Sequence, residues 1–181
     1  KKTTEVIEAA MQKNMYTAKL KKLPYPEVTI QYYELEQYEV ERDHPYILRV
    51  IKNKVPYEYL IHRRSDNNKL IVFHNGAIAG GNVNVPVFQR HSWDKVLKTS
   101  TVFCMDPTLY LNRFLQLGWG IGKNEDYYLE NSSLILKTII EKMHIRLEDT
   151  AIYGTSAGGY LSILMGTYLK GAKVVADNAQ L

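Results

Sequence analysis

The amino-acid sequence predicts an α/β fold, a three-layer sandwich around a mostly parallel sheet with an antiparallel N-terminal start. From residue 70 onward, short and continuously apolar runs alternate with longer polar or helical stretches. Strands that are apolar on both faces are typical of a parallel sheet covered by helices. Before residue 70 the chain has tyrosine-rich, β-forming segments joined by short turns, which favours antiparallel pairing.

The part of the chain before residue 70 begins with a predicted helix. Residues 3–20 carry apolar side chains at helical spacing, and prolines at 24 and 26 prevent the helix from continuing. Three β-rich segments follow, at 28–35, 46–52 and 56–63. The last two read as a hairpin around Asn53-Lys54. Because the proline pair is the only internal boundary, we expect a helical segment over 1–24 and one α/β domain over 25–181.

Four short apolar runs are the predicted strands of the parallel sheet: 70–73, 101–105, 150–153 and 173–176. Residues 126–143 carry Leu136, Ile139 and Ile140 on one stripe, which predicts a helix. A second helix is predicted from Tyr160 to Leu169. The alternation gives βαβ units, whose crossovers are expected to be right-handed.

The composition is that of an ordinary globular domain, with 45% hydrophobic and 23% charged residues. The formal charge of +4 is mild and the lysines are spread out, so the sequence gives no support to a nucleic-acid role. The densest group, Lys19, Lys21 and Lys22, would end the N-terminal helix, where cations suit the helix dipole. No apolar run approaches the roughly 20 residues of a membrane span and no signal peptide is recognisable, so we expect a cytoplasmic protein.

Cysteine and histidine usage gives two further expectations. The single cysteine, Cys104, excludes an internal disulfide, and its apolar surroundings predict a buried, inert thiol. The five histidines are scattered and form no HExxH-like pair, so the sequence predicts no metal site.

The most informative stretch is Gly154-Thr155-Ser156-Ala157-Gly158, which fits the pattern G-x-S-x-G. A strand leads into it and an apolar helix follows, which is the context of the nucleophile elbow of α/β-hydrolases. Ser156 is therefore the candidate nucleophile, and the amide of Ala157 is a candidate oxyanion-hole donor at the start of the helix. The alternative is a turn of small residues that only joins the strand to the helix.

A second feature, His74-Asn75-Gly76-Ala77, directly follows the first buried strand. In this fold class the loop after that strand supplies the other oxyanion amide, so Asn75, Gly76 or Ala77 is the candidate donor. A glycine-rich connector is the alternative. His74 precedes the serine, whereas the chain order of the fold is serine, acid, histidine, so we assign it to orienting the loop rather than to catalysis.

Two aspartates follow predicted strands. Asp106, before Pro107, either caps a turn or lines the cleft at the carboxyl end of its strand. Asp177 follows the last strand and is a candidate orienting acid. The glycines of segment 118–122 resemble a phosphate loop, but no lysine-serine pair closes it, which argues against a nucleotide site.

Five segments occur in a recognisable order: 74–76, 106–108, 117–119, 154–159 and 177–180. Together they resemble α/β-hydrolase proteins encoded among bacterial capsular polysaccharide genes, a group including XcbB/CpsF-type proteins and capsule O-acetyltransferases. The resemblance covers roughly residues 70–181 and implies that Ser156 accepts the acyl group. It also implies that the acid and the histidine lie beyond Leu181, so that the sheet is incomplete at the C-terminus.

The implied function is acyl transfer on a carbohydrate ester, by an O-acetyltransferase or an esterase linked to capsular or surface polysaccharide. The partner would be a carbohydrate or small ester, with no bound cofactor and an acyl donor such as acetyl-CoA as co-substrate. Because the last strand would expose an apolar edge, we also expect homo-oligomers or aggregates. One alternative is a non-catalytic accessory or glycan-binding protein with a degenerate fold. Another is a site that recruits His74 or His91 together with Asp106.

Overall fold

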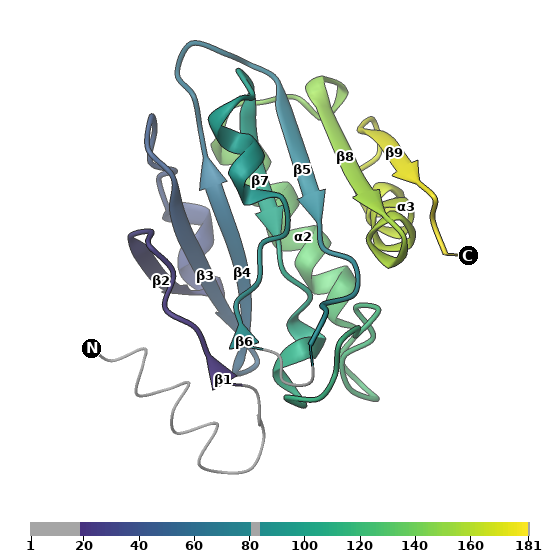
Figure 1. Cartoon of the computed structure of the whole chain (residues 1–181). Helices are drawn as coiled ribbons and strands as arrows, with labels where there is room; N and C mark the ends of the chain where they lie inside the picture. The colour runs from purple at the N-terminus through teal and green to yellow at the C-terminus, as the bar shows by residue number, and fades with distance from the viewer. Residues whose placement is uncertain (1–18, 81–83, 181) are drawn as a thin grey trace.

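The computed structural model describes residues 19–80 and 84–180, and in this part of the chain a seven-stranded mixed sheet forms the centre (Figure 1). Its order is β2-β3-β4-β7-β5-β8-β9. The strands are β2 (Glu27–Gln31), β3 (Tyr46–Lys52), β4 (Val55–His62), β5 (Leu70–His74), β7 (Ser100–Cys104), β8 (Thr150–Thr155) and β9 (Lys173–Asp177). Outside this sheet, β1 (Lys19–Leu20) pairs in parallel with β6 (Asn84–Val85).

The direction of the strands confirms a mostly parallel sheet, but its antiparallel part is the β4 strand and not the N-terminal start, because β2 pairs in parallel with β3. Strand β4 is antiparallel to both β3 and β7, whereas β7, β5, β8 and β9 pair in parallel. The hairpin turn between β3 and β4 is Asn53-Lys54, as expected, and both residues have positive φ, at 52° and 64°. Two central residues with positive φ match the right-handed twist of the flanking strands in a two-residue turn.

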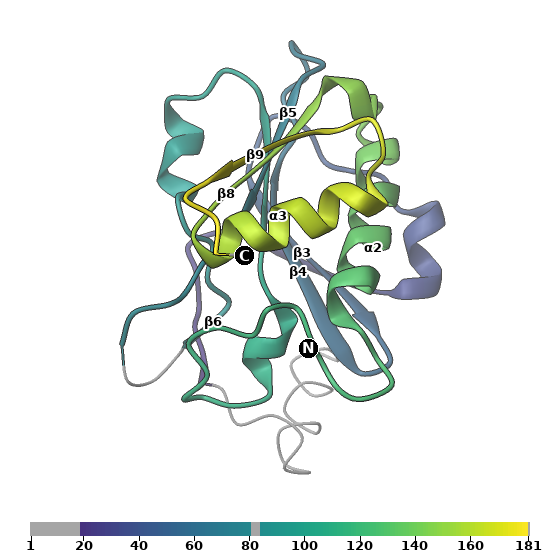
Figure 2. The same ribbon diagram turned by 90° about the vertical axis from the view of Figure 1, so that its right-hand side faces the viewer.

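Helices α2 (Tyr128–Lys142) and α3 (Ala157–Tyr168) pack on one face of the sheet together with the 3-10 helix η1 (Tyr32–Gln37), as Figure 2 shows. The opposite face is covered by loops and by the 3-10 helices η2 (His91–Lys95) and η3 (Pro107–Tyr110). A short 3-10 turn, η4 (Leu147–Asp149), leads into β8. Burial on both faces, which the sequence predicts for the apolar strands, is found in β5 and β7, because these two strands lie in the middle of the sheet.

On the face away from α2, a buried ion pair joins the first two antiparallel strands. Arg49 and Glu58 are direct cross-strand neighbours, and the Arg49 Nε donates to the Glu58 Oε1 at 2.6 Å. The Tyr110 hydroxyl donates to the second oxygen of the same carboxylate. Burial raises the pKa of Glu58, against the opposing effects of Arg49 and of these hydrogen bonds. Its charge is therefore sustained by partners and not by water.

The N-terminal expectation needs a correction. Most of the predicted helix 3–20 lies outside the described residues, but its last two, Lys19 and Leu20, form strand β1. The Lys21 amide continues this pairing by donating to the Val85 carbonyl at 2.6 Å. Tertiary pairing overrides the local periodicity at these two residues, so Lys19 and Leu20 are not part of a helix.

Three other boundaries differ from the expectation. The β-rich segment 28–35 turns into η1 after Gln31, because Gln31 and Glu34 form a capping box. Helix α3 begins at residue 157 instead of 160, directly at the serine turn. Strand β9 is not covered on both faces, since it is the outermost strand and Val175 is 50% exposed. This is the exposed apolar edge that the sequence predicts.

The cysteine expectation is confirmed, since Cys104 lies in the core and burial raises the pKa of its thiol. In the described ranges, no helix is both long and apolar enough to cross a bilayer. Nor do three or more potential metal ligands gather anywhere in these ranges.

Candidate active site at the serine turn

Ser156 occupies a sharp, strained turn between β8 and α3. Its backbone has φ 54° and ψ −128°, a conformation that L side chains rarely adopt. The Ser156 amide donates to the Asp177 carbonyl at 3.1 Å, and its carbonyl accepts from the amides of Gly159 and Gln180 at 3.0 and 3.2 Å. These contacts on both sides hold the strained residue in place. Its side chain is partly exposed and makes no hydrogen bond within the described residues.

Two glycines let this turn close. A Cβ on Gly154 would lie 2.1 Å from the Gly158 carbonyl oxygen, and a Cβ on Gly158 would lie 2.9 Å from the His74 carbonyl oxygen. The first turn of α3 therefore contacts the backbone at the ends of both β8 and β5. The spacing G-x-S-x-G is required by this close approach.

The loop after β5 lies against the serine turn, as the sequence predicts. A Cβ on Gly76 would be 3.2 Å from the Thr155 carbonyl oxygen. However, the Gly76 amide already donates to the Gln89 Oε1 at 2.9 Å, and the Gln89 Nε2 donates to the Ala77 carbonyl at 2.9 Å. Gln89 thus braces the loop and occupies one of the candidate oxyanion donors.

Asn75 has a bracing role as well. Its side chain is buried, donates to the Gly76 carbonyl at 3.1 Å and accepts from the Asp106 amide at 3.1 Å. It therefore ties the loop after β5 to the end of β7. Of the candidate donors in the loop, Gln89 uses only the Gly76 amide, which leaves the amides of Asn75 and Ala77. On the other side, the amide of Ala157, as the first residue of α3, has no intrahelical acceptor.

His74 is buried beneath this loop. Neither ring nitrogen has a hydrogen-bond partner in the described part of the chain. Burial lowers the pKa of His74 from 6.5 to about 4, and the Asn75 backbone acts in the opposite direction. The ring is therefore neutral at neutral pH, and the hydrogen bonds that position the loop come from Asn75 and Gln89.

This burial makes stability depend on pH. The unfolded chain binds a proton at His74 near pH 6.5, whereas the folded chain resists it until about pH 4. The stabilisation is therefore complete above pH 6.5 and is lost as the pH falls towards 4, by on the order of 3 kcal/mol. Urea unfolding of the wild type and of His74→Phe across this range should show a steeper acid loss in the wild type. Parallel profiles would contradict the assignment.

Asp106 is structural in its contacts. It is 1% exposed, its Oδ1 accepts from the Thr108 amide at 2.9 Å and its Oδ2 accepts from the Gly120 amide at 2.9 Å. Burial raises the pKa of Asp106, opposed by these amide hydrogen bonds. The carboxylate thus caps η3 and holds segment 118–122, and it is not open to a cleft. The glycines of this segment are close-packing positions, because a Cβ on Gly118 would lie 2.7 Å from the Asp106 Oδ2 and a Cβ on Gly120 would lie 2.7 Å from the Leu129 Cβ.

The remaining candidates do not converge on the serine hydroxyl. Asp177 is exposed at the end of β9 and reaches Ser156 through its backbone carbonyl. The His91 Nδ1 is engaged with the Tyr25 hydroxyl at 2.8 Å. Hence the described residues place no imidazole at Ser156, and the triad from His74 or His91 with Asp106 is not assembled in this structure.

In addition to Gln89, two residues near the serine turn were not predicted from the sequence, namely Arg90 and Tyr160. The Arg90 guanidinium donates to the Thr155 Oγ1 at 2.5 Å and lies over the rings of Trp93 and Tyr153. Tyr160, in the first turn of α3, meets the ring of Trp119 edge-on with centroids 5.2 Å apart. No local pattern identifies these contacts, because Arg90 and the Trp119 partner of Tyr160 come from loops distant in the sequence.

An aromatic pocket of about 380 Å³ lies next to Ser156. Its lining residues are Trp119, Ile121, Tyr127, Tyr160 and Gln180. Two of them touch the serine backbone, since the amides of Tyr160 and Gln180 both donate to the Ser156 carbonyl. The pocket therefore adjoins the backbone of the serine turn, and a pocket of this size with aromatic walls is a natural place for a ligand.

No family model matches the sequence, and no curated protein matches it. Solved structures do. The capsule O-acetyltransferase of Neisseria meningitidis serogroup A is 17% identical with a TM-score of 0.54, over 71% of this chain and 53% of that chain. The Glycosylation Associate Protein (Gap123) complex from Streptococcus agalactiae is 18% identical with a TM-score of 0.54, over 73% and 23%.

Thermogutta terrifontis esterase 2 is 12% identical with a TM-score of 0.51, over 78% of this chain and 59% of that chain. The chain therefore spans about half the length of the O-acetyltransferase it matches. At these identities the likeness shows the fold, which is the α/β-hydrolase fold expected from the sequence.

Proposed function

We propose that this α/β-hydrolase fold carries a serine-dependent acyl transfer in which Ser156 is the nucleophile. The observation that carries the proposal is the strained backbone of Ser156, at φ 54° and ψ −128°, between a parallel strand and a helix N-terminus. Backbone strain of this kind persists only where the surroundings enforce it, and it gathers at functional sites. A turn that merely joined β8 to α3 would not need it.

The proposed chemistry follows from the groups around the hydroxyl. The Ser156 oxygen attacks the carbonyl carbon of an ester or thioester, and the carbonyl oxygen becomes an oxyanion. The amide of Ala157, at the positive end of α3, is one donor to it. The amide of Asn75 or of Ala77 is the second, because Gln89 occupies the amide of Gly76. The proton of the hydroxyl needs a base, which in this mechanism is an imidazole oriented by a carboxylate. When the oxyanion collapses, the bond from the carbonyl carbon to the alcohol oxygen or thioester sulfur breaks, and the leaving alcohol or thiol departs with that proton, which leaves the acyl group on Ser156.

For the substrate we propose a carbohydrate ester, with an O-acetyltransferase or an esterase as the two forms of the reaction. The supporting observation is the likeness to the capsule O-acetyltransferase, for which a complex with CoA has also been solved. Acetyl-CoA is accordingly the proposed acyl donor. The two forms differ in whether a sugar hydroxyl or water accepts the acyl group from Ser156.

A fluorophosphonate probe tests the nucleophile directly. We expect stoichiometric labelling of the protein at Ser156 by mass spectrometry, and none in Ser156→Ala. The matched control is Ser92→Ala, which removes an exposed serine of η2 and should label like the wild type. Thermogutta terrifontis esterase 2, which shares the fold, has been solved as its adduct with paraoxon, another organophosphorus reagent.

A second function is favoured by one observation, the lack of an imidazole at Ser156 within the described residues. It is a non-catalytic accessory or glycan-binding role that keeps the fold. This role predicts that the probe leaves Ser156 unlabelled while the protein still binds a glycan.

A further inference from the structure

One side of the aromatic pocket is formed by segment 118–122, whose backbone is fixed by hydrogen bonds to buried side chains. Three residues of segment 118–122 have positive φ, namely Trp119 at 56°, Gly120 at 65° and Gly122 at 74°. The buried Asp106 carboxylate accepts from the Gly120 amide, and the Thr108 hydroxyl accepts from the Gly122 amide at 3.1 Å. A strained loop that is fixed by a buried carboxylate presents Trp119 at a defined position.

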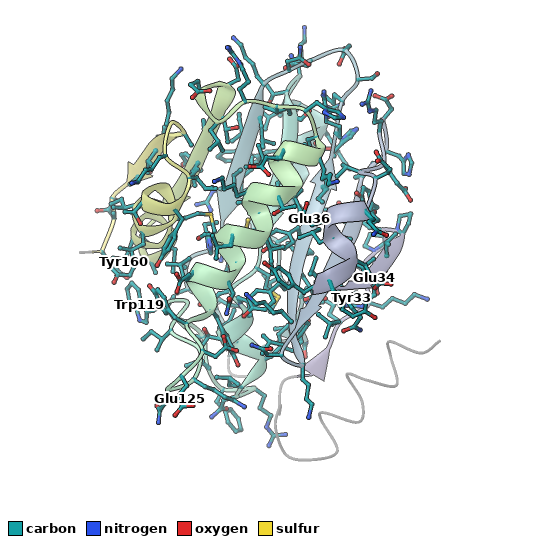
Figure 3. All side chains as sticks on the ribbon, turned by 180° about the vertical axis from the view of Figure 1, so that it is seen from behind. Tyr33, Glu34, Glu36, Trp119, Glu125 and Tyr160 are labelled. Carbon is teal, nitrogen blue, oxygen red and sulfur yellow. The ribbon has the colours of Figure 1, made fainter. Side chains whose placement is uncertain are left out.

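The pocket continues into a polar neighbour. A second hollow of about 490 Å³ shares Ile121 and Tyr127 with the aromatic pocket. Its polar lining comprises Lys123, Asn124, Glu125, Asp126 and Glu130. In Figure 3 the labelled Tyr160, Trp119 and Glu125 follow one another along the same edge of the molecule. The groove therefore runs from Tyr160 and Gln180, which bind the Ser156 carbonyl, over aromatic rings to carboxylates and an amide.

This order of groups matches one ligand chemistry. A pyranose ring presents C–H groups on its faces, which pack on aromatic rings, and hydroxyls on its rim, which donate to carboxylate and amide oxygens. An acyl chain would gain nothing from the polar half of the groove. Three carboxylates against one lysine disfavour an anionic sugar.

We propose that this groove is a subsite for an uncharged sugar ring, stacked on Trp119 and Tyr160 with its hydroxyls towards Glu125 and its polar neighbours. The assignment rests on the proposed function, because it supplies the carbohydrate on which Ser156 would act. It adds the position of the sugar, its uncharged character and the residue that recognises it.

Saturation-transfer NMR with a panel of trisaccharides tests the subsite. The neutral probes are maltotriose, mannotriose and N-acetylglucosamine trimer, and the anionic probe is a sialic acid trimer. We expect a neutral probe to bind, with saturation strongest on the C–H protons of one ring face. Trp119→Ala should weaken this binding about tenfold or more, as loss of an aromatic contact does.

Phe114→Ala is the matched control, since it removes an aromatic ring that is 59% exposed and lies outside the groove. It should bind like the wild type, and so should Ser156→Ala. Absence of binding by every neutral probe, equal binding by Trp119→Ala, or tighter binding of the sialic acid trimer would each overturn the subsite. Fluorophosphonate labelling of Ser156 is a separate readout, so failure of the subsite and failure of the nucleophile are distinguished.

Discussion

Ser156→Ala should lower the turnover of an activated acetyl ester by the protein at least about a thousandfold, with little change in KM. Alanine keeps the turn, because a Cβ is already present at this strained position, and removes only the attacking oxygen. The effect therefore falls on kcat. Residual turnover would come from the oxyanion donors at Ala157 and in the loop after β5, which bind the developing charge without a nucleophile.

The measurement is the steady-state hydrolysis of p-nitrophenyl acetate by the wild type, Ser156→Ala and the control Ser92→Ala. Circular dichroism and the urea midpoint should confirm that both variants fold. If Ser156→Ala retained the wild-type kcat, the serine mechanism would be rejected and the turnover would have to come from another residue. If the wild type itself showed no turnover above the uncatalysed rate, the binding role would take its place.

The second large effect concerns stability and lies far from the serine. Arg49→Met should destabilise the protein by about 3–5 kcal/mol, because it leaves the Glu58 carboxylate buried without its cation. Glu58 is 1% exposed, so water cannot replace the lost partner. Burial already raises the pKa of Glu58, and loss of Arg49 raises it further. The destabilisation should therefore be greatest at neutral pH and diminish as falling pH protonates the carboxyl.

Urea unfolding at pH 7 and at pH 5 measures both the loss and its pH dependence. The double variant Arg49→Met with Glu58→Leu removes both charges and should recover most of the stability, since a buried pair replaced by apolar groups is often neutral or better. A double variant as unstable as the single one would show that the loss comes from packing and not from the unpaired charge.

Local patterns were enough to predict the centre of the fold and the serine turn. Continuous apolar runs identify β5, β7 and β8, because strands in the middle of a parallel sheet are buried on both faces. The five residues around Ser156 identify its turn, since their small side chains are needed by the backbone approach at Gly154 and Gly158. Both signals are contained in short windows of sequence.

What the sequence did not predict depends on distant partners. The use of the Gly76 amide by Gln89 requires two loop residues 13 positions apart to meet. The two-residue strand β1 forms by pairing with β6, which is distant in the sequence. The local spacing of apolar residues suggests a helix there and gives no sign of this pairing. In the sequence, Trp119 is one residue of a glycine-rich segment with no sign of its contact. In the structure, the buried carboxylate of Asp106 binds the Gly120 amide, and Trp119 lies against Tyr160.

The chain of hydrogen bonds through Asn75 and Asp106 has an entropic consequence. Asn75 binds the loop after β5 and the Asp106 amide, while the Asp106 carboxylate binds the Gly120 amide. The loop after β5 and segment 118–122 are thereby joined through one buried network. Segment 118–122, which supplies Trp119 and Ile121 to the aromatic pocket, is therefore already ordered in the folded protein, so a ligand in that pocket loses little binding free energy to loop immobilisation.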